Sequence, residues 1–97
     1  MLIRLFVYKD DCVHVIEMDI PVYAIVAQLE HQLNRLNKLS IPYVAYGYTD
    51  EEGWLPLYQF AYEWHKLEQY IGVKPMKYYD IKGETPWETK LFEILRL

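Results

Sequence analysis

The stretch LPLYQFAYEWHKLEQYIG, residues 55–72, carries the greatest amount of large apolar surface of any predicted element. At 100° per residue its apolar positions fall on one arc, which predicts an amphipathic helix. This arc consists of Leu57, Phe60, Ala61, Trp64, Leu67 and Ile71. Pro56 suits the first helical position, and Gly72 followed by Pro75 suits a helix end. We therefore predict a helix from Pro56 to Gly72 at the centre of the core.

The start of this helix has an alternative. Residues 54–58 could instead form a strand that pairs with the strand at residues 43–48, with the helix starting near Gln59. We favour the helix because Leu57 belongs to the helical arc and Pro56 lacks the N–H donor that a strand ladder requires.

The N-terminal part of the chain predicts a hairpin followed by a helix. Leu2–Tyr8 and Val13–Asp19 are rich in β-branched and aromatic residues, and the polar break Lys9–Cys12 between them suits a turn. Val22–Leu39 follows with a helical apolar period. The apolar arc of that helix consists of Val22, Ile25, Val26, Leu29, Leu33 and Leu36.

With the remaining segments, the predicted elements indicate an α+β fold. Tyr43–Thr49 and Met76–Ile81 are predicted strands, and Thr85–Glu88 has the form of a capping box that starts a short C-terminal helix. We predict one domain over residues 1–97, with a mixed or antiparallel sheet of four or five strands, two long helices and the short one. The element order is β-β-α-β-(β)-α-β-α, and with the disputed strand residues 13–81 resemble in part the ferredoxin-like order.

The amino-acid composition excludes several classes of function. Of the 97 residues, 53% are apolar and 25% charged, which is typical of a globular protein. The net charge is −4 and the lysines and arginines are scattered, so we do not expect nucleic-acid binding. Cys12 is the single cysteine, and no apolar run has the length of a membrane span. We expect an intracellular, cytoplasmic protein that does not enter a membrane.

Catalytic and metal-binding candidates are few. His65 and Glu68 lie three residues apart on the predicted helix, and Glu68 falls on its apolar arc, where a carboxylate needs a partner or a proton. These two residues are the catalytic candidates. The alternative is that Glu68 has no catalytic role and lies at the rim of the core, paired with a lysine, an arginine or a tyrosine hydroxyl. Cys12 and His14 share one face of a strand, but two ligands do not make a metal site. We predict no metal and no cofactor.

Tyrosine is the unusual feature of the composition, with ten residues in a short chain. Since each buried hydroxyl needs a partner and tyrosine is common in binding hot spots, we expect several tyrosines to form an interface. The arc beside the apolar arc of the central helix is the predicted surface for a two-fold homodimer. Its members are Tyr58, Tyr62, His65 and Gln69.

The first functional hypothesis is a non-enzymatic protein-interaction domain that binds itself and an unidentified protein partner, of the kind found among accessory proteins of viruses or mobile elements. The alternative is a small enzyme or ligand-binding domain with a Glu/His/Tyr cleft. A third hypothesis is stacking of single-stranded nucleic acid on Tyr43, Tyr46 and Tyr48, which the acidic balance disfavours.

Overall fold

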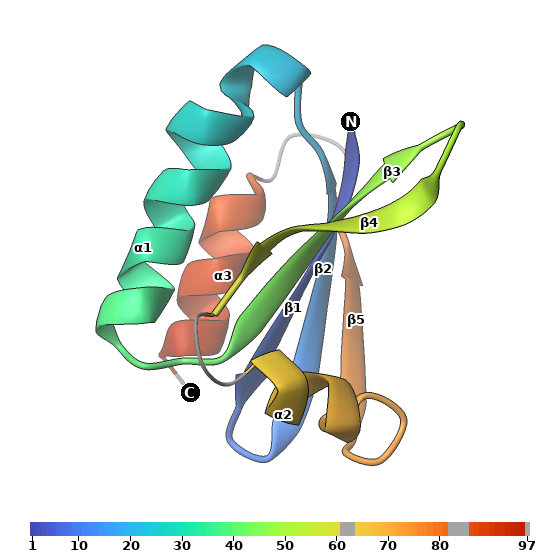
Figure 1. The fold of residues 1–97 in the computed structure, drawn as a ribbon. Helices are drawn as coiled ribbons and strands as arrows, with labels where there is room; N and C mark the ends of the chain where they lie inside the picture. Colours follow the sequence, from blue (N-terminus) through green and yellow to red (C-terminus); the bar gives the residue numbers. More distant parts are fainter. Residues whose placement is uncertain (61–63, 82–85, 97) are drawn as a thin grey trace.

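The computed structural model describes residues 1–60, 64–81 and 86–96, with only the backbone described at residues 64–66. These residues form an α+β fold around a five-stranded mixed sheet in the order β4-β3-β1-β2-β5 (Figure 1). All neighbouring strands are antiparallel except β2 and β5, which are parallel. The strands are β1 (Leu2–Lys9), β2 (Cys12–Asp19), β3 (Tyr43–Thr49), β4 (Gly53–Gln59) and β5 (Met76–Asp80).

The predicted N-terminal hairpin is confirmed. Lys9 pairs with Cys12, and the two residues between them, Asp10 and Asp11, have φ angles of 54° and 59°. Positive φ at both central positions defines the two-residue turn whose twist matches that of the flanking strands, and Asp tolerates this conformation better than most residues do.

The first helical segment is continuous but changes its winding. A 3₁₀ turn η1 (Val22–Ala24) leads into a π-helix η2 (Ile25–Glu30) and then into α1 (His31–Lys38). Because a π-helix has wider turns than an α-helix, the 100° wheel misplaces its side chains. Val22 and Val26, predicted to be buried, are each 67% exposed, whereas Leu29, Leu33 and Leu36 are buried as predicted.

The prediction of a long helix from Pro56 is wrong. Residues 53–59 form the edge strand β4, which is antiparallel to β3, and the helix α2 covers only Trp64–Tyr70. Pro56 is tolerated because an edge strand leaves one side of its ladder unpaired. A bulge opposite Ala45 and Tyr46 shifts the register of β4. The two helices are therefore not both long, since α2 has seven residues.

The ferredoxin-like order is not confirmed. The hairpin strand β1 occupies the centre of the sheet between β2 and β3, and β5 pairs with β2 in parallel at the far edge. The C-terminal helix α3 (Trp87–Leu95) packs against β2, and it buries Trp87, Leu91 and Ile94. Thr85 of the predicted capping box lies outside the described residues.

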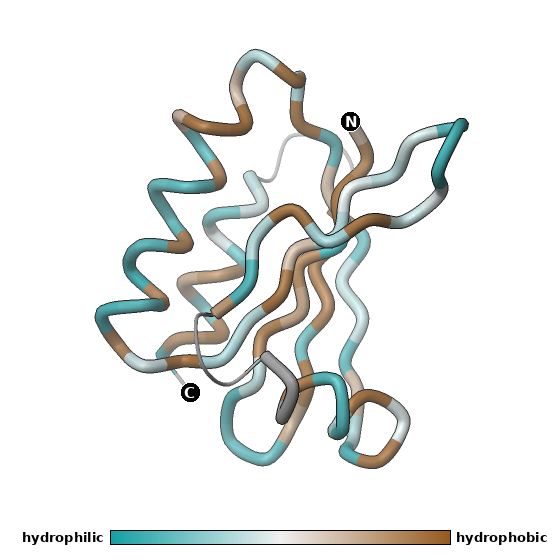
Figure 2. The backbone as a smooth tube through the Cα atoms, viewed as in Figure 1, coloured by the Kyte–Doolittle hydropathy of each residue, from teal (hydrophilic) through white to brown (hydrophobic). Residues whose placement is uncertain are grey.

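The sheet carries apolar clusters on both faces. On one face, β1 buries Ile3, Leu5 and Val7 against the first helix and α3. Figure 2 shows this pattern, with hydrophobic residues along the central strands and on the inner side of the first helix. On the other face, a smaller cluster gathers Val13, Val15, Val44 and Leu67 under α2.

Leu67→Ala should remove the main anchor of α2. Leu67 is fully buried, and a helix of seven residues is not stable without tertiary packing. We expect a loss of about 2–5 kcal/mol in the free energy of unfolding, measured by urea denaturation. Leu39→Ala, at a side chain 59% exposed, is the matched control and should cost much less. Equal losses in the two variants would contradict the assignment of Leu67 as the anchor.

Candidate functional site

The face of the sheet that carries α2 is only partly covered. Alternate residues of a strand point to opposite faces, so Arg4 and Phe6 of β1 lie on this face beside Tyr46 of β3. Beyond α2 these side chains surround a depression of about 240 Å³. Its lining, which we call the aromatic cleft, consists of Arg4, Phe6, Tyr46, Trp54 and Ile71.

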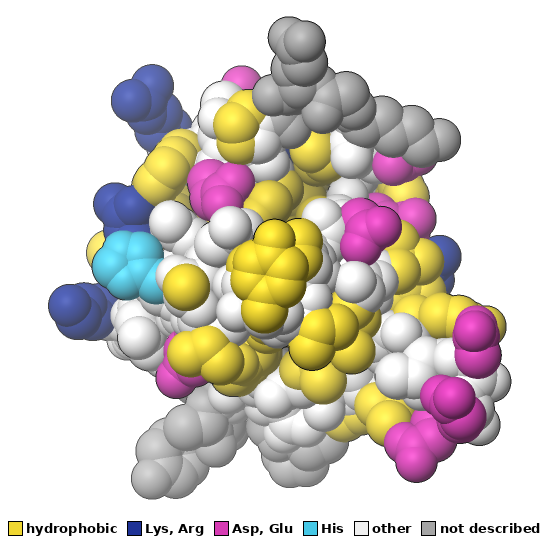
Figure 3. All heavy atoms as spheres, turned by 90° about the horizontal axis from the view of Figure 1, so that it is seen from above, with side chains coloured by type: hydrophobic (Ala, Val, Ile, Leu, Met, Phe, Trp, Pro, Cys, Tyr) yellow, Lys and Arg dark blue, Asp and Glu magenta, His cyan; other side chains and the backbone are white. Residues whose placement is uncertain are grey.

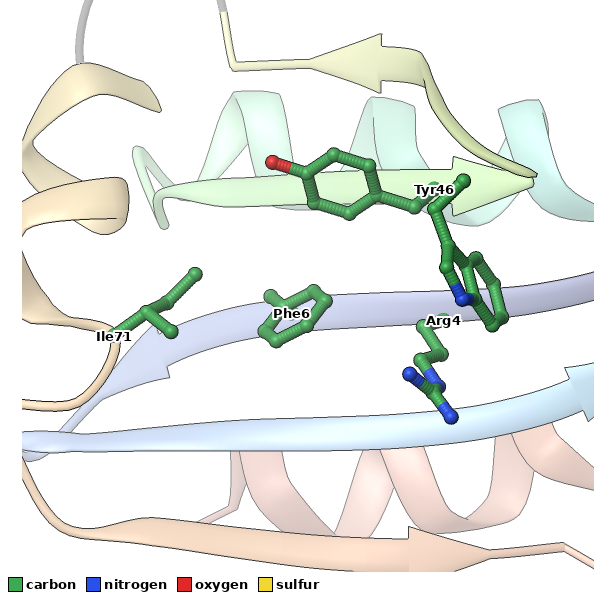
Figure 4. Close-up of a pocket in the computed structure, with 5 residues that line it drawn as sticks. Arg4, Phe6, Tyr46 and Ile71 are labelled. Carbon is green, nitrogen blue, oxygen red and sulfur yellow. The ribbon is translucent and has the colours of Figure 1, made fainter. Parts of the chain in front are cut away.

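Figure 4 shows the arrangement of the aromatic cleft. Phe6 lies at its centre, with Ile71 on one side and Arg4 on the other, and the ring of Tyr46 stands beside Phe6. The rings of Phe6 and Tyr46 meet edge to face, with centroids 5.6 Å apart. Such packing holds both rings in place without closing the space above them. The cleft therefore has a rigid apolar floor.

Arg4 closes one end of the cleft and is held by several groups. Its Nε donates to a Glu17 carboxylate oxygen at 2.8 Å, and its guanidinium lies 4.3 Å from the centroid of the Trp54 ring. The Tyr78 hydroxyl donates to the same Glu17 oxygen, and the Tyr78 ring lies on the other side of the guanidinium at 6.0 Å. These contacts orient the half-buried ring of Trp54 and the exposed ring of Tyr78.

Tyr46 connects the cleft to α2. Its hydroxyl donates to Glu68 Oε1 at 3.3 Å. Burial of the phenol raises the pKa of Tyr46, and the nearby negative charge of Glu68 raises it further. Glu68 itself is exposed, so its carboxylate lies at the rim of the cleft and not in the core.

Two further aromatic side chains extend the surface toward the β3–β4 hairpin and the β5 edge. Tyr48 is 41% exposed and packs edge to face on Trp54, with centroids 5.3 Å apart, while Tyr78 is 54% exposed. Trp54 is not among the predicted site residues, because the favoured helix begins at Pro56 and leaves Trp54 just before it, without a partner strand. The available signal was the aromatic-rich run directly after a Gly-containing turn, which is typical of a hairpin.

Two residues of the predicted dimer surface, Tyr58 and Gln69, have described side chains, and the surface as a whole stays a prediction. Tyr58 lies on β4, packs against the core on the helix side, and hydrogen-bonds with the side chain of Glu30. Gln69 lies on α2, which packs on the opposite face of the sheet. Tyr62 and the side chain of His65 lie outside the described residues, so the Glu68–His65 pair and its cleft stay a prediction.

The other candidates are separated by the fold. Tyr43 of the predicted stacking platform is buried on the helix side, and its hydroxyl donates to Asn37 at 3.1 Å, whereas Tyr46 and Tyr48 lie on the open face. Cys12 is partly exposed and His14 is buried. Over the described part of the chain, no three His, Cys, Asp or Glu residues are grouped to hold a metal ion.

Comparisons with known proteins do not assign a family. No family model matches the chain, and neither a curated protein nor a solved structure matches it. Among the helices that the structure describes, none is long and apolar enough to cross a membrane. Functional inference therefore starts from the geometry of the cleft and its surroundings.

Glu68→Gln should lower the pKa of Tyr46, because a neutral amide no longer opposes formation of the phenolate. A titration of ¹³C-labelled tyrosine followed by NMR would measure this shift. Since the pair is exposed, the stability should change by less than about 1 kcal/mol. Glu51→Gln on the β3–β4 turn is the control and should leave Tyr46 unchanged. An unaltered Tyr46 pKa in Glu68→Gln would show that the two groups do not interact.

His14 should make stability depend on pH. Burial is the largest effect and lowers the pKa of His14, while a backbone hydrogen bond at Lys9 opposes it. The charges of Lys77 and Lys9, which lower the pKa, and of Asp10, which raises it, have smaller effects. The unfolded state then binds the proton more readily, so stability falls as the pH drops below about 6.5.

Urea denaturation near neutral pH and at mildly acidic pH would measure this effect. His14→Phe, which keeps an aromatic ring beside Tyr79, should remove this part of the acid destabilisation. His31→Gln, at an exposed site on α1, should retain it. Identical pH profiles for wild type and His14→Phe would exclude His14 as the source.

Proposed function

We propose that this protein is a small protein-interaction domain that binds a partner protein through the aromatic cleft. The observation that carries the proposal is the half-covered face of the sheet, where tryptophan, tyrosine and arginine surround an apolar depression. These three residue types dominate the energetics of protein interfaces. Held in place by ring packing and by the Arg4–Glu17 pair, they would lose little conformational entropy on binding.

The size of the depression supports a side chain as its occupant. Pockets for drug-sized ligands and cofactors have volumes of roughly 300–1,000 Å³. The aromatic cleft, at about 240 Å³, is smaller and open to one side. It fits one large apolar side chain of a partner, with Phe6 as the floor and Trp54 and Tyr46 as walls.

The charges around the cleft support a basic partner segment. Glu17 and Glu68 lie at its edges, and Asp50, Glu51 and Glu52 form the nearby turn between β3 and β4. Among the five residues that line the cleft, only Arg4 is basic, and its charge is paired with that of Glu17. The partner segment should therefore carry lysine or arginine beside its apolar anchor. The same acidic rim would repel the phosphates of a nucleic acid.

A selection from a random peptide library displayed on phage would test the proposal. Peptides retained by the wild type should contain a large apolar residue flanked by lysine or arginine. Isothermal titration calorimetry of a selected peptide should then show affinity about 30-fold or more weaker for Trp54→Ala, as expected for a hot spot. Circular dichroism would verify that the variant is folded.

Leu39→Ala is the control, because Leu39 is 59% exposed just after α1, on the helix side of the sheet. This variant should bind the peptide like the wild type. Peptides that bind Trp54→Ala as tightly as the wild type would contradict the proposal. A single-stranded oligonucleotide whose binding is abolished by Trp54→Ala would instead support the stacking hypothesis.

A further inference from the structure

A second surface lies on the other side of β4. Val22, Tyr23 and Val26, at the start of the first helix, are 67%, 89% and 67% exposed. Leu55 and Leu57 of β4 are also exposed. Together these five residues form what we call the helix–β4 surface. Isolated exposed apolar residues are common, but a contiguous group of them marks an interaction site.

Contacts beneath the helix–β4 surface run from β4 through Met1 to Ile20, two residues before η1. Leu57 lies against Gly47 beside the Met1 side chain, so closely that a Cβ at Gly47 would come within 2.7 Å of Leu57 Cδ1 and 2.8 Å of Met1 Sδ. The Met1 carbonyl accepts a hydrogen bond of 3.0 Å from the Ile20 amide, two residues before the helix starts. The absence of a side chain at Gly47 thus leaves room for Leu57 beside Met1, and Tyr58, the next residue of β4, hydrogen-bonds with Glu30 at the end of η2.

The winding of the helix gives a reason for this exposure. Val22 belongs to the 3₁₀ turn and Val26 to the π-helix, and this end of the first helical segment extends beyond the ends of the central strands (Figure 1). π-helical turns are rare and occur frequently at functional sites. An α-helix would direct Val22 and Val26 toward the core, whereas the altered winding directs them outward.

Charge is distributed asymmetrically about this surface. Figure 3, which views this end of the molecule, shows hydrophobic residues in the middle, basic residues and a histidine on one side, and an acidic cluster on the opposite side. Exposed His31, Arg35 and Lys38 of α1 supply basic side chains beyond the helix start. Exposed Asp50, Glu51 and Glu52 form the tip of the β3–β4 hairpin.

We propose that the helix–β4 surface binds a second copy of this chain and forms a two-fold dimer. The two-fold axis would pass through the apolar centre, between the acidic flank and the basic flank. Each copy would then place its acidic β3–β4 hairpin against α1 of the other copy, so the contact forms two times. The apolar centre would pack on itself. This arrangement satisfies both flanks with one surface, whereas a partner of a single charge sign would satisfy only one.

The dimer packs side chain on side chain, and not strand on strand. Pro56 lacks an N–H donor, and the bulge next to it disturbs the ladder of β4. Both features are typical of edge strands that resist pairing with another chain. The aromatic cleft lies on the opposite face of the sheet, and none of its five lining residues belongs to the helix–β4 surface. The acidic β3–β4 turn enters both proposals, so Trp54→Ala and Val26→Asp, which lie outside that turn, separate partner binding from self-association.

Sedimentation equilibrium of the full chain tests the dimer. The wild type should show a monomer–dimer equilibrium in the micromolar range at low salt. Val26→Asp, which buries a charge in the centre of the proposed interface, should raise the dissociation constant at least about 10-fold. Val73→Asp is the matched control at another exposed valine, 77% exposed, in the loop after α2, and should dimerise like the wild type.

Charge reversal tests the proposed orientation. Glu51→Lys with Glu52→Lys should weaken the dimer, and so should His31→Glu with Lys38→Glu. All four substitutions in one chain should restore much of the affinity, because the flanks are complementary again. A wild type that is monomeric throughout the micromolar range would overturn the proposal. A Val26→Asp variant that dimerises like the wild type would also overturn it. So would a quadruple variant whose dimer affinity is no higher than that of either double variant.

Discussion

The central position of β1 is the constraint on which the rest of the structure depends. Because side chains alternate along a strand, the odd residues Ile3, Leu5 and Val7 all face the first helix and α3. Arg4 and Phe6 therefore face the other side and form part of the aromatic cleft. One strand thus supplies the floor of the main core and the floor of the candidate binding site, and a shift of one residue in its register would exchange them.

The same alternation makes β4 a shared element of both proposed surfaces. Trp54 faces the aromatic cleft beside Arg4, whereas Leu57 lies against Gly47 on the helix side. β4 can serve both sides because it is an edge strand with neither face fully covered. Its proline and bulge would disrupt the hydrogen bonds of a central strand, but at the edge they reduce stability little. They also hinder another strand from pairing with the free side of β4.

The small size of α2 explains why a binding surface remains open. A longer helix on that face would bury Tyr46 and Trp54 along with Val44. Seven residues cover only the part around Leu67, and Ile71 ends the covered region at the margin of the cleft. The uncovered rings then depend on contacts within their own face, of which the Arg4–Glu17 pair and the Phe6–Tyr46 packing are the best defined.

Sequence patterns predicted much of the fold where one local signal dominated. Period-two runs of β-branched and aromatic residues located β1, β2, β3 and β5, and α3 begins within the segment Thr85–Glu88 that was predicted to start a short C-terminal helix. Of the candidate site, the sequence indicated a tyrosine-rich interface, but placed it at Tyr58, Tyr62, His65 and Gln69 and not at the aromatic cleft. Tyr46 and Glu68 were named for other roles, and Trp54, Arg4 and Phe6 were not named as site residues.

The sequence by itself determined the class of the fold, the hairpin and the buried faces of α1 and α3, because these follow from side-chain period and turn chemistry within a few residues. Only the tertiary structure decided between strand and helix at residues 53–59, since the pairing partner β3 competes there with a helical period of similar strength. It also decided the exposure of Val22 and Val26 through the π-helical winding, and the meeting of Arg4, Trp54 and Tyr78. Those three residues come from three strands, and the order of strands in a sheet depends on long-range packing that no local pattern encodes.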